Sequence, residues 1–179
     1  MVKEVFTKSP NFNSRWCAEI ARIDYVLPIE GKDLIEQVII DGHSVVCERG
    51  RFTKGQVVIL CKGDTRLCRG FLYQNSLYDK KHAHLNKDKK LSGYFEATRR
   101  VKIQKFNQGQ TISEGYIFGV AELGRHKHNL ADINLEDYLE HRNGMEVPLE
   151  FDEICTTRFI KRFINPHRMN DQEYMNGIK

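Results

Sequence analysis

Three short apolar segments, separated by turn sequences, mark the N-terminal third of the chain. Residues 18–27 place apolar side chains between polar ones, residues 34–40 are rich in β-branched residues, and residues 57–61 are apolar throughout. Alternation and β-branched composition are typical of β-strands. Asp41-Gly42 lies between residues 34–40 and 44–47, and this dipeptide favours a tight turn between antiparallel strands. The pattern predicts a small, tightly wound β-barrel.

A second hairpin is predicted further along the chain. Residues 94–106 alternate apolar and basic side chains as a strand would, and Gln108-Gly109 then turns the chain into residues 111–120. Gly115 and Gly119 in the returning strand suit a sharply bent barrel strand, because glycine permits a bulge or a close approach of the backbone.

The remaining segments are predicted to be connectors. Residues 67–73 read as a short connector, and residues 79–93 are too polar to hold a core position, so we expect a mobile loop there. Asn134 can cap a helix that runs from Leu135 to about Arg142, with Gly144 just past its end.

These elements predict a mainly β fold class: an OB-like antiparallel β-barrel with a small C-terminal appendage that contains α-helix. The expected organisation is an N-terminal extension (residues 1–15), an OB-like nucleic-acid-binding domain (16–123) and a helical connector with a tail (124–179). A chain of 179 residues with 40% hydrophobic residues can bury a core of that size.

Composition narrows the cellular context. The five cysteines form no C-x-x-C pair, and an odd number at irregular spacing does not make a disulfide framework. No apolar run reaches the roughly 18 residues that a membrane-spanning helix needs, and the N-terminus lacks the apolar stretch of a secretory signal. We therefore expect a soluble protein of the reducing cytoplasm with no membrane partner.

Basic residues are unevenly distributed along the chain. The net charge is only +4, but lysines gather in residues 80–90 and basic residues gather again in residues 99–105. A local basic face favours a polyanionic partner. The alternative is a solvated loop followed by a charged strand, which is common on protein surfaces.

Two blocks of residues, in the same order, carry a resemblance to a known family. Matching residues in the two blocks are Ala18, Ile20, Ile23, Pro28, Ile29, Asp33, Ile35, Glu36, Ile40, Gly42, Val45, Val46, Gly50, Phe52 and Gly55, then Arg100, Val101, Lys102, Lys105, Gly109, Ser113 and Gly115. They resemble A-x-I-x-x-I, P-I-x-x-A-D-x-I-E-x-x-x-V-x-G-W-x-V-V, K-G-E-F-x-x-G-D and R-V-K-x-x-K-L-R-G-x-x-S-Q-G, motifs of the N-terminal OB-like domain of Naegleria-type RNA ligases.

The chain departs from this family at several positions. His43 stands where the family has tryptophan, residues 62–65 replace its E-I-D-S, residues 107–109 replace its L-R-G, and residues 113–115 replace its S-Q-G. These changes remove an acidic position and an arginine. We therefore expect contacts that differ from those of the family.

The resemblance implies that the chemistry lies outside this chain. Such ligases form a lysyl-AMP intermediate on the lysine of a K-x-D-G motif, in a separate nucleotidyltransferase domain. Lys62-Gly63-Asp64-Thr65 imitates that motif but falls at the end of a predicted strand, where a polar turn is the favoured interpretation. We expect no catalytic residue and no cofactor here; ATP and Mg²⁺ belong to a nucleotidyltransferase domain supplied in cis or in trans.

Other chemistry finds little support in the sequence. His82 and His84 form one His-x-His pair, and His126 and His128 form another, but zinc needs more ligands and no cysteine pair lies nearby. No metal site is predicted. The chain also has no G-x-S-x-G, P-loop or G-x-G-x-x-G motif.

The predicted function is RNA binding through phosphate contacts, with single-stranded RNA or a nicked duplex as the ligand. Aromatic residues near the basic segments would stack on bases. The predicted RNA-binding residues are Arg99, Arg100, Lys102, Lys105, Lys80 and Lys81 for phosphates, with Tyr94 and Phe106 for stacking.

Two alternatives stay open. The chain could be a fragment of a complete RNA ligase, whose K-x-D-G motif would follow Lys179, or a non-enzymatic adaptor that binds proteins. The adaptor gains support where the basic residues of segment 99–105 scatter instead of lining one groove.

Overall fold

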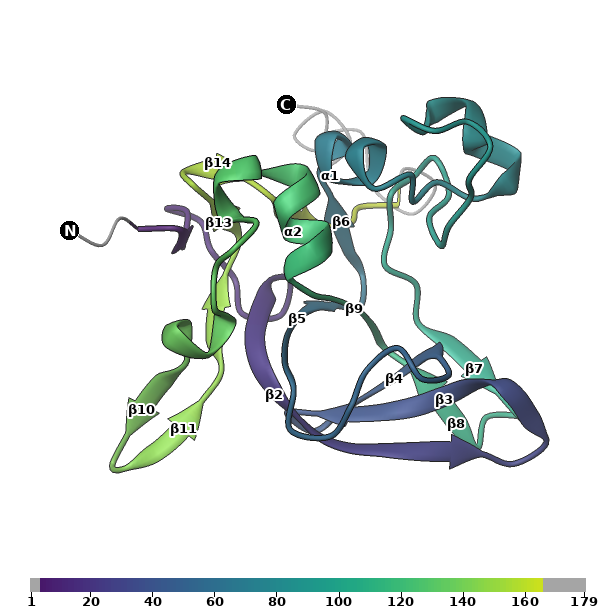
Figure 1. Cartoon of the computed structure of the whole chain (residues 1–179), viewed down its shortest axis with the longest axis horizontal. Helices are drawn as coiled ribbons and strands as arrows, with labels where there is room; N and C mark the ends of the chain where they lie inside the picture. Colours follow the sequence, from purple (N-terminus) through teal and green to yellow (C-terminus); the bar gives the residue numbers. More distant parts are fainter. Residues whose placement is uncertain (1–3, 166–179) are drawn as a thin grey trace.

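The computed structural model describes residues 4–165 of the chain. Its architecture is mainly β: an antiparallel sheet curls into a nearly closed barrel, and the few helices are short (Figure 1). This confirms the predicted fold class of a mainly β, antiparallel barrel. No helix in the described part of the chain combines the length and the apolar character needed to cross a membrane.

Fifteen strands and five short helices make up the described chain. The strands are β1 (Phe6–Thr7), β2 (Ala18–Ile29), β3 (Lys32–Ile40), β4 (His43–Glu48), β5 (Val57–Lys62), β6 (Thr65–Leu67), β7 (Gln104–Phe106), β8 (Thr111–Ser113), β9 (Gly115–Phe118), β10 (Glu140–Arg142), β11 (Met145–Val147), β12 (Leu149–Phe151), β13 (Glu153–Ile154), β14 (Thr157–Arg158) and β15 (Ile160–Arg162). The helices are α1 (Arg69–Gln74), α2 (Val120–His126) and three 3₁₀ helices, η1 (Lys80–Leu85), η2 (His128–Leu130) and η3 (Leu135–Tyr138).

The barrel sheet has the strand order β4-β3-β2-β5-β9, and all neighbours are antiparallel. β2 is long enough to pair with β5 through its first half and with β3 through its second half. The ends of the sheet meet at β4, where the Glu114 N–H donates to the Ser44 carbonyl at 2.9 Å. The Val46 N–H also donates to Ser113 Oγ at 2.9 Å. These two bonds bring the edges of the sheet together.

β5 is buried on both faces and separates two apolar cores. Val58 and Leu60 face the barrel interior, whereas Ile59 and Cys61 face a second core beneath the helices. Successive side chains of a strand point to opposite faces, so one apolar strand can serve both cores. The barrel core consists of Ala21, Ile23, Val38, Ile40, Val45, Phe52, Val58, Leu60 and Ile117.

The second core joins segments that are far apart in the sequence. Phe71 of α1 packs against Phe118 of β9, with 4.6 Å between ring centroids, and against Phe159, with 5.1 Å. All three rings are essentially inaccessible to solvent. Aromatic burial of this size fixes α1 and the segment around residue 159 relative to the barrel.

Both terminal segments pair with strands from distant parts of the chain. β1 pairs with β13, and the Ser9 N–H donates to Asp152 Oδ1 at 2.7 Å. β12 pairs with β2, and β15 pairs with β6. The predicted domain boundaries, at residues 15 and 123, stay predictions.

The turn and strand predictions for the first barrel segment are confirmed. Asp41 and Gly42 have φ angles of +48° and +75°, as a hairpin turn with two left-handed residues requires. The predicted segments 18–27, 34–40 and 57–61 all lie within β2, β3 and β5.

The second predicted hairpin is only partly correct. The prediction that residues 94–106 form one strand is wrong, because only Gln104–Phe106 pairs in a ladder. Arg99 has a φ of +62°, which breaks an extended chain. The Val101 N–H donates to the Thr65 carbonyl at 2.8 Å and thereby ties the segment to another loop. The turn into β8 occurs at residues 107–109, as predicted.

Three connector predictions need correction. Residues 67–73 contain most of α1. The Asn134 side chain does accept from the Glu136 N–H at 3.2 Å, but the helix ends at Tyr138. Gly144, predicted to lie just past the helix end, instead forms a turn with Asn143 between β10 and β11, with φ angles of +53° at Asn143 and +76° at Gly144.

Residues 79–93 contribute no side chain to either apolar core, as predicted, but one polar side chain of the segment is buried. Residues 80–85 form η1, and the side chain of Asn86 is completely buried. Its amide accepts from the Tyr78 N–H at 2.9 Å and donates to the carbonyls of Tyr78 at 3.2 Å and Leu91 at 2.9 Å. A single buried amide thus substitutes for the apolar core that this segment lacks.

Gly115 lies where two strands approach too closely for a side chain. A Cβ atom at this position would lie 2.7 Å from Leu60 Cδ1 and 3.0 Å from the Cys61 carbonyl oxygen. The prediction of a close backbone approach is confirmed here. It is wrong for Gly119, where the nearest atom to an added Cβ is a Glu122 carboxylate oxygen at 3.9 Å.

Gly115→Ala should therefore lower the free energy of unfolding by about 1–3 kcal/mol, because the added methyl group overpacks the strand crossing. Urea denaturation measures this change. Gly70→Ala is the matched control, since a Cβ there meets only ordinary contacts with His126 and alanine favours the helix. A Gly115→Ala protein as stable as wild type would contradict the packing argument.

The imidazole of His126 should make the free energy of unfolding depend on pH in the acid range. It packs edge-on against Phe71, and burial together with the charge of Lys127 lowers the pKa of His126 to about 4 from its usual 6.5. The unfolded chain then binds one more proton than the folded chain between these values, so stability falls as the pH decreases through this range. Urea denaturation of His126→Phe at about pH 7 and 4.5 should show a smaller decrease than wild type. The exposed His141→Gln should behave as wild type, and equal decreases in all three proteins would rule out this role for His126.

Candidate anion-binding site

A cavity of about 280 Å³ opens between β6, β15 and the start of α1. Five basic side chains surround an apolar floor made of Leu67, Phe159 and Ile160. The five are Arg66, Arg69, Arg99, Arg158 and Lys161, and we call them the basic cluster. They come from three separate stretches of sequence, residues 66–69, 99 and 158–161.

Strand pairing and one unusual backbone conformation bring the basic cluster together. β6 and β15 pair so that Arg66 lies opposite Lys161. Arg99 reaches the cavity because its φ of +62° turns the chain. Its guanidinium then donates to the Leu67 carbonyl at 2.8 Å, and the Leu67 N–H donates to the Arg99 carbonyl at 3.2 Å. The conformation of Arg99 is therefore held by a pair of hydrogen bonds.

The basic cluster has no anionic partner among residues 4–165. Burial, reinforced by the charge of Arg69, lowers the pKa of Arg66. Burial and neighbouring arginines likewise lower the pKa values of Arg99 and Lys161. Among residues 4–165, the ion pairs include no member of the cluster. The cations therefore repel one another in a setting that only a bound anion would neutralise.

One donor in the basic cluster has no acceptor. The Nε atom of Arg66 is buried and makes no hydrogen bond within the described chain. A buried donor without a partner costs about 1–3 kcal/mol. Guanidinium groups present several N–H donors in a fixed plane and match the oxygens of phosphate. The cavity has the chemistry of a phosphate site.

The structure separates the residues predicted for phosphate binding. Arg99 belongs to the basic cluster, but Arg100 pairs with Asp64 at 2.7 Å and Lys102 pairs with Glu96 at 3.3 Å. Lys105 is exposed on β7, and Lys80 and Lys81 lie on η1. Arg100 and Lys102 thus already have acidic partners, whereas Arg99 has none in the part of the chain that the structure describes.

The two predicted stacking residues are both half-buried. The Tyr94 ring packs against Phe95 and Tyr116, at 4.8 and 5.5 Å between centroids. Its hydroxyl accepts from the Lys102 N–H at 2.9 Å, and burial raises the pKa of Tyr94 to about 12. One face of the Tyr94 ring is therefore occupied by packing contacts. Phe106 lies on β7 in the second hairpin.

Sequence reasoning missed four of the five residues in the basic cluster. Arg66 and Arg69 flank a short apolar stretch, and Arg158 and Lys161 flank another, 90 residues later. Each looks like an ordinary surface charge in its own segment. One signal could have indicated the site: in both stretches, two apolar residues are flanked by basic residues. Paired strands beside a charged site would show this pattern.

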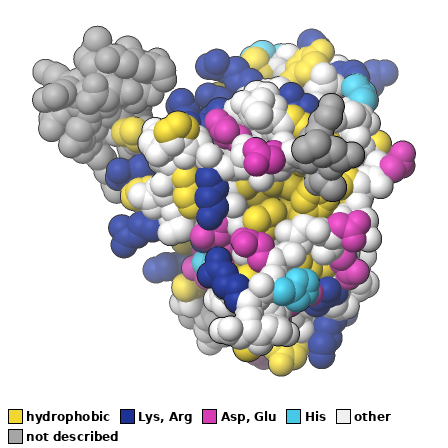
Figure 2. Space-filling view, turned by 90° about the vertical axis from the view of Figure 1, so that its left-hand side faces the viewer, with side chains coloured by type: hydrophobic (Ala, Val, Ile, Leu, Met, Phe, Trp, Pro, Cys, Tyr) yellow, Lys and Arg dark blue, Asp and Glu magenta, His cyan; other side chains and the backbone are white. Residues whose placement is uncertain are grey.

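A second basic hollow lies at the other end of α1. It is lined by Lys87, Lys89, Lys90 and Arg125, with Asp88 as its acidic residue. Arg69 begins α1 in the first cavity and Gln74 ends it in the second. Figure 2 shows Lys and Arg side chains at several heights of one face of the molecule, with Asp and Glu side chains among them.

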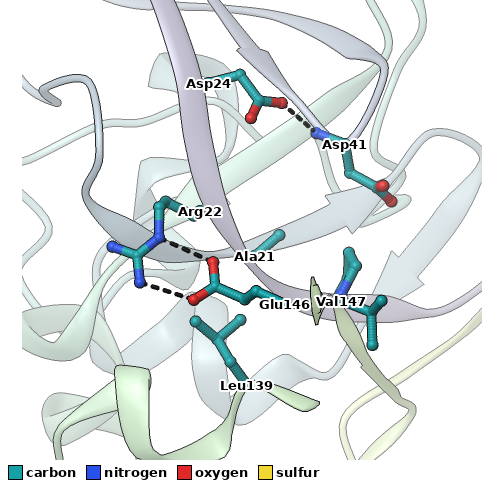
Figure 3. A pocket seen from close by; sticks show the side chains of 8 residues that line it. Ala21, Arg22, Asp24, Asp41, Leu139, Glu146 and Val147 are labelled. Carbon is teal, nitrogen blue, oxygen red and sulfur yellow. Dashed lines mark hydrogen bonds and ion pairs between the residues drawn. The ribbon is translucent and has the colours of Figure 1, made fainter. Parts of the chain in front are cut away.

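A third hollow, between β2 and the β10–β11 hairpin, has a different character (Figure 3). Arg22 donates to both carboxylate oxygens of Glu146, at 2.8 and 2.9 Å, and also to Glu136 at 2.8 Å. The guanidinium in this hollow is neutralised by its own neighbours. It therefore has no charge left for an anionic ligand.

Lys62, the lysine of the K-x-D-G imitation, ends β5. Its Nζ donates to Glu150 Oε2 at 3.0 Å and to the Ser14 carbonyl at 2.8 Å. Although burial lowers it, the hydrogen bond to Glu150 and the nearby acidic groups raise the pKa of Lys62 above its usual value. A nucleophilic lysine needs the opposite shift.

Comparison with known proteins gives a likeness to one enzyme. No family model matches the chain, and no curated protein matches it either. Solved structures of Naegleria gruberi RNA ligase are similar: an apo mutant at 18% identity over 65% of this chain, and the enzyme with PPi at 17% over 65%, each with a TM-score of 0.41. The chain spans 31% of the length of each ligase structure.

Removing one cation from the basic cluster should stabilise the protein. The charge of Arg69 lowers the pKa values of three neighbours, so Arg69→Gln should raise the free energy of unfolding by up to about 1 kcal/mol at low salt. The gain should shrink as salt screens the repulsion. Urea denaturation at two ionic strengths measures it. Arg142→Gln, an exposed change on β10, is the control, and a destabilised Arg69→Gln protein would mean that the cluster is not repulsive.

Proposed function

We propose that this chain binds RNA through its phosphates, as an accessory module that positions RNA ends for a ligase. The observation that carries the proposal is the basic cluster: five cations around one cavity, without an ion pair to any described residue. A fold does not hold such repulsion without a cost in stability, and a bound polyanion would offset it.

The two basic hollows together suit a chain of phosphates better than a single anion. They lie at the two ends of α1, which has six residues and is therefore about 9 Å long. A ligand that extends along α1 would contact the basic cluster and the lysines of residues 87–90. Each neutralised phosphate adds affinity and makes binding more sensitive to salt.

RNA is chosen among polyanions because of the sequence motifs that resemble those of RNA ligases. The proposed role needs no ATP or Mg²⁺ in this chain, because sealing would be done by a nucleotidyltransferase domain in cis or in trans. The environment of Lys62 supports a non-catalytic role for this chain, since the salt bridge to Glu150 at 3.0 Å keeps the Lys62 amine protonated.

Fluorescence anisotropy with a labelled single-stranded RNA and a nicked duplex tests the proposal. The double variant Arg69→Gln/Arg158→Gln removes two exposed members of the basic cluster. It should bind about tenfold more weakly at roughly 0.1 M salt, and its salt dependence should be less steep by about two released ions.

Two further variants make the test specific. Arg100→Gln/Lys102→Gln should cost less affinity, because both side chains already pair with carboxylates. Arg49→Gln/Arg142→Gln removes two exposed charges away from the cavity and should have little effect. Absence of RNA binding at low salt would overturn the proposal and favour a protein-binding adaptor. Equal losses in all three double variants would instead indicate that net charge, not the cavity, attracts RNA.

A further inference from the structure

The barrel interior ends in a polar mouth. Glu19 follows the alternation of β2, so its side chain shares the barrel-facing side of the strand with Ala21 and Ile23. Asp41 in the β3–β4 turn and His43 at the start of β4 reach the same place. Ligand-type atoms of Glu19, Asp41 and His43 all lie within 4.8 Å of one another.

Glu19 is the unusual member of this group. It is only 1% exposed, and its Oε1 atom has no hydrogen-bond donor within residues 4–165. Its other oxygen lies 3.6 Å from Lys62 Nζ, but Lys62 is closer to Glu150, at 3.0 Å. One shared lysine therefore does not neutralise the carboxylates around it.

Glu19 is buried, His43 is half-buried and Asp41 is exposed, so the group opens to solvent at the Asp41 side. Two carboxyl groups that approach this closely need a proton or a cation between them. A metal ion placed between the Glu19 and Asp41 carboxyl groups would gain two carboxylate ligands and supply the partner that Glu19 Oε1 lacks within residues 4–165. The imidazole of His43 adds a third ligand of the type that transition metals prefer.

We propose that Glu19, Asp41 and His43 form a binding site for a divalent transition metal ion, with Zn²⁺ as the best match. Two carboxylates and one imidazole are a zinc ligand set that leaves a position for water. Ligands at about 2.1 Å from one ion lie no more than about 4.2 Å apart. The observed separations require only small side-chain adjustments.

Neighbouring groups orient two of the three ligands. Nδ1 of His43 lies 3.6 Å from Glu114 Oε1, and a carboxylate behind an imidazole is a common support for a metal-binding histidine. The Asp41 N–H donates to Asp24 Oδ2 at 3.3 Å, and Figure 3 shows the Asp41 carboxylate pointing away from Asp24. The site would tie β2 to the turn between β3 and β4.

The proposed metal site does not depend on the resemblance to RNA ligases. His43 stands where that family has tryptophan, so one of the three ligands is particular to this chain. The two His-x-His pairs that the sequence displays do not converge in this way: His82 pairs with Asp79 at 2.7 Å, and His126 is packed among aromatic rings. The inference is also independent of the proposed RNA binding.

Isothermal titration calorimetry of the metal-free full chain with ZnCl₂ tests the inference, and thermal unfolding with and without Zn²⁺ gives a second readout. We expect one equivalent to bind and to raise the melting temperature. Asp41→Asn and His43→Gln should each weaken binding at least about tenfold. Asparagine tolerates the left-handed φ of +48° at residue 41, so the turn should survive.

Controls separate this site from other zinc-binding groups. Asp24→Asn changes a neighbouring carboxylate, and His82→Gln disrupts the His82-x-His84 pair; both should bind as wild type. Spectra of the Co²⁺-loaded chain should lack the thiolate charge-transfer band that cysteine ligation would give. The inference is overturned if Zn²⁺ does not bind, if Asp41→Asn and His43→Gln bind normally, or if His82→Gln abolishes binding. It is also overturned if Glu19→Gln stabilises the chain and no variant changes its response to Zn²⁺, which would indicate a shared proton only.

Discussion

The double burial of β5 is the constraint on which the rest of the structure depends. Val58 and Leu60 supply the barrel core, while Ile59 and Cys61 supply the core beneath the helices. Burial of each large side chain contributes about 1.5–3 kcal/mol, so a polar residue on either face would weaken one core. Both candidate sites lie against these cores. The basic cluster lies over Phe159 of the second core, and the polar mouth begins at the barrel end of β5, beside Lys62.

The sequence predicts the barrel strands up to the end of β5 better than it predicts the rest of the fold. The strands up to Lys62 were predictable because their alternation and the Asp41-Gly42 turn are local signals. Beyond that point some local signals held, such as the turn before β8, and others misled: Asn143-Gly144 suits either a helix end or a hairpin, and only pairing of β10 with β11 decides between them. The basic cluster was not predictable, since no short window contains more than two of its members. His43 attracted attention only as a departure from a family motif.

The two sites show opposite forms of electrostatic imbalance. Around the cavity, cations lack anions, and around Glu19, carboxylates exceed the one lysine that serves them. Natural domains are stable by only about 5–15 kcal/mol, so each imbalance is a measurable share of the total. Arg22, by contrast, is paired with Glu136 and Glu146. Unpaired charge at a partly buried position is typical of ligand sites.

The buried amide of Asn86 has a consequence for how this surface can evolve. It organises residues 78–91 from within, through three hydrogen bonds to backbone atoms. The shape of the segment therefore does not depend on which side chains point outward from it. Mutation can add, remove or shift lysines there without disturbing the fold, so long as the asparagine stays. Substitutions on this surface could therefore change which ligands it binds while the backbone beneath it stays the same.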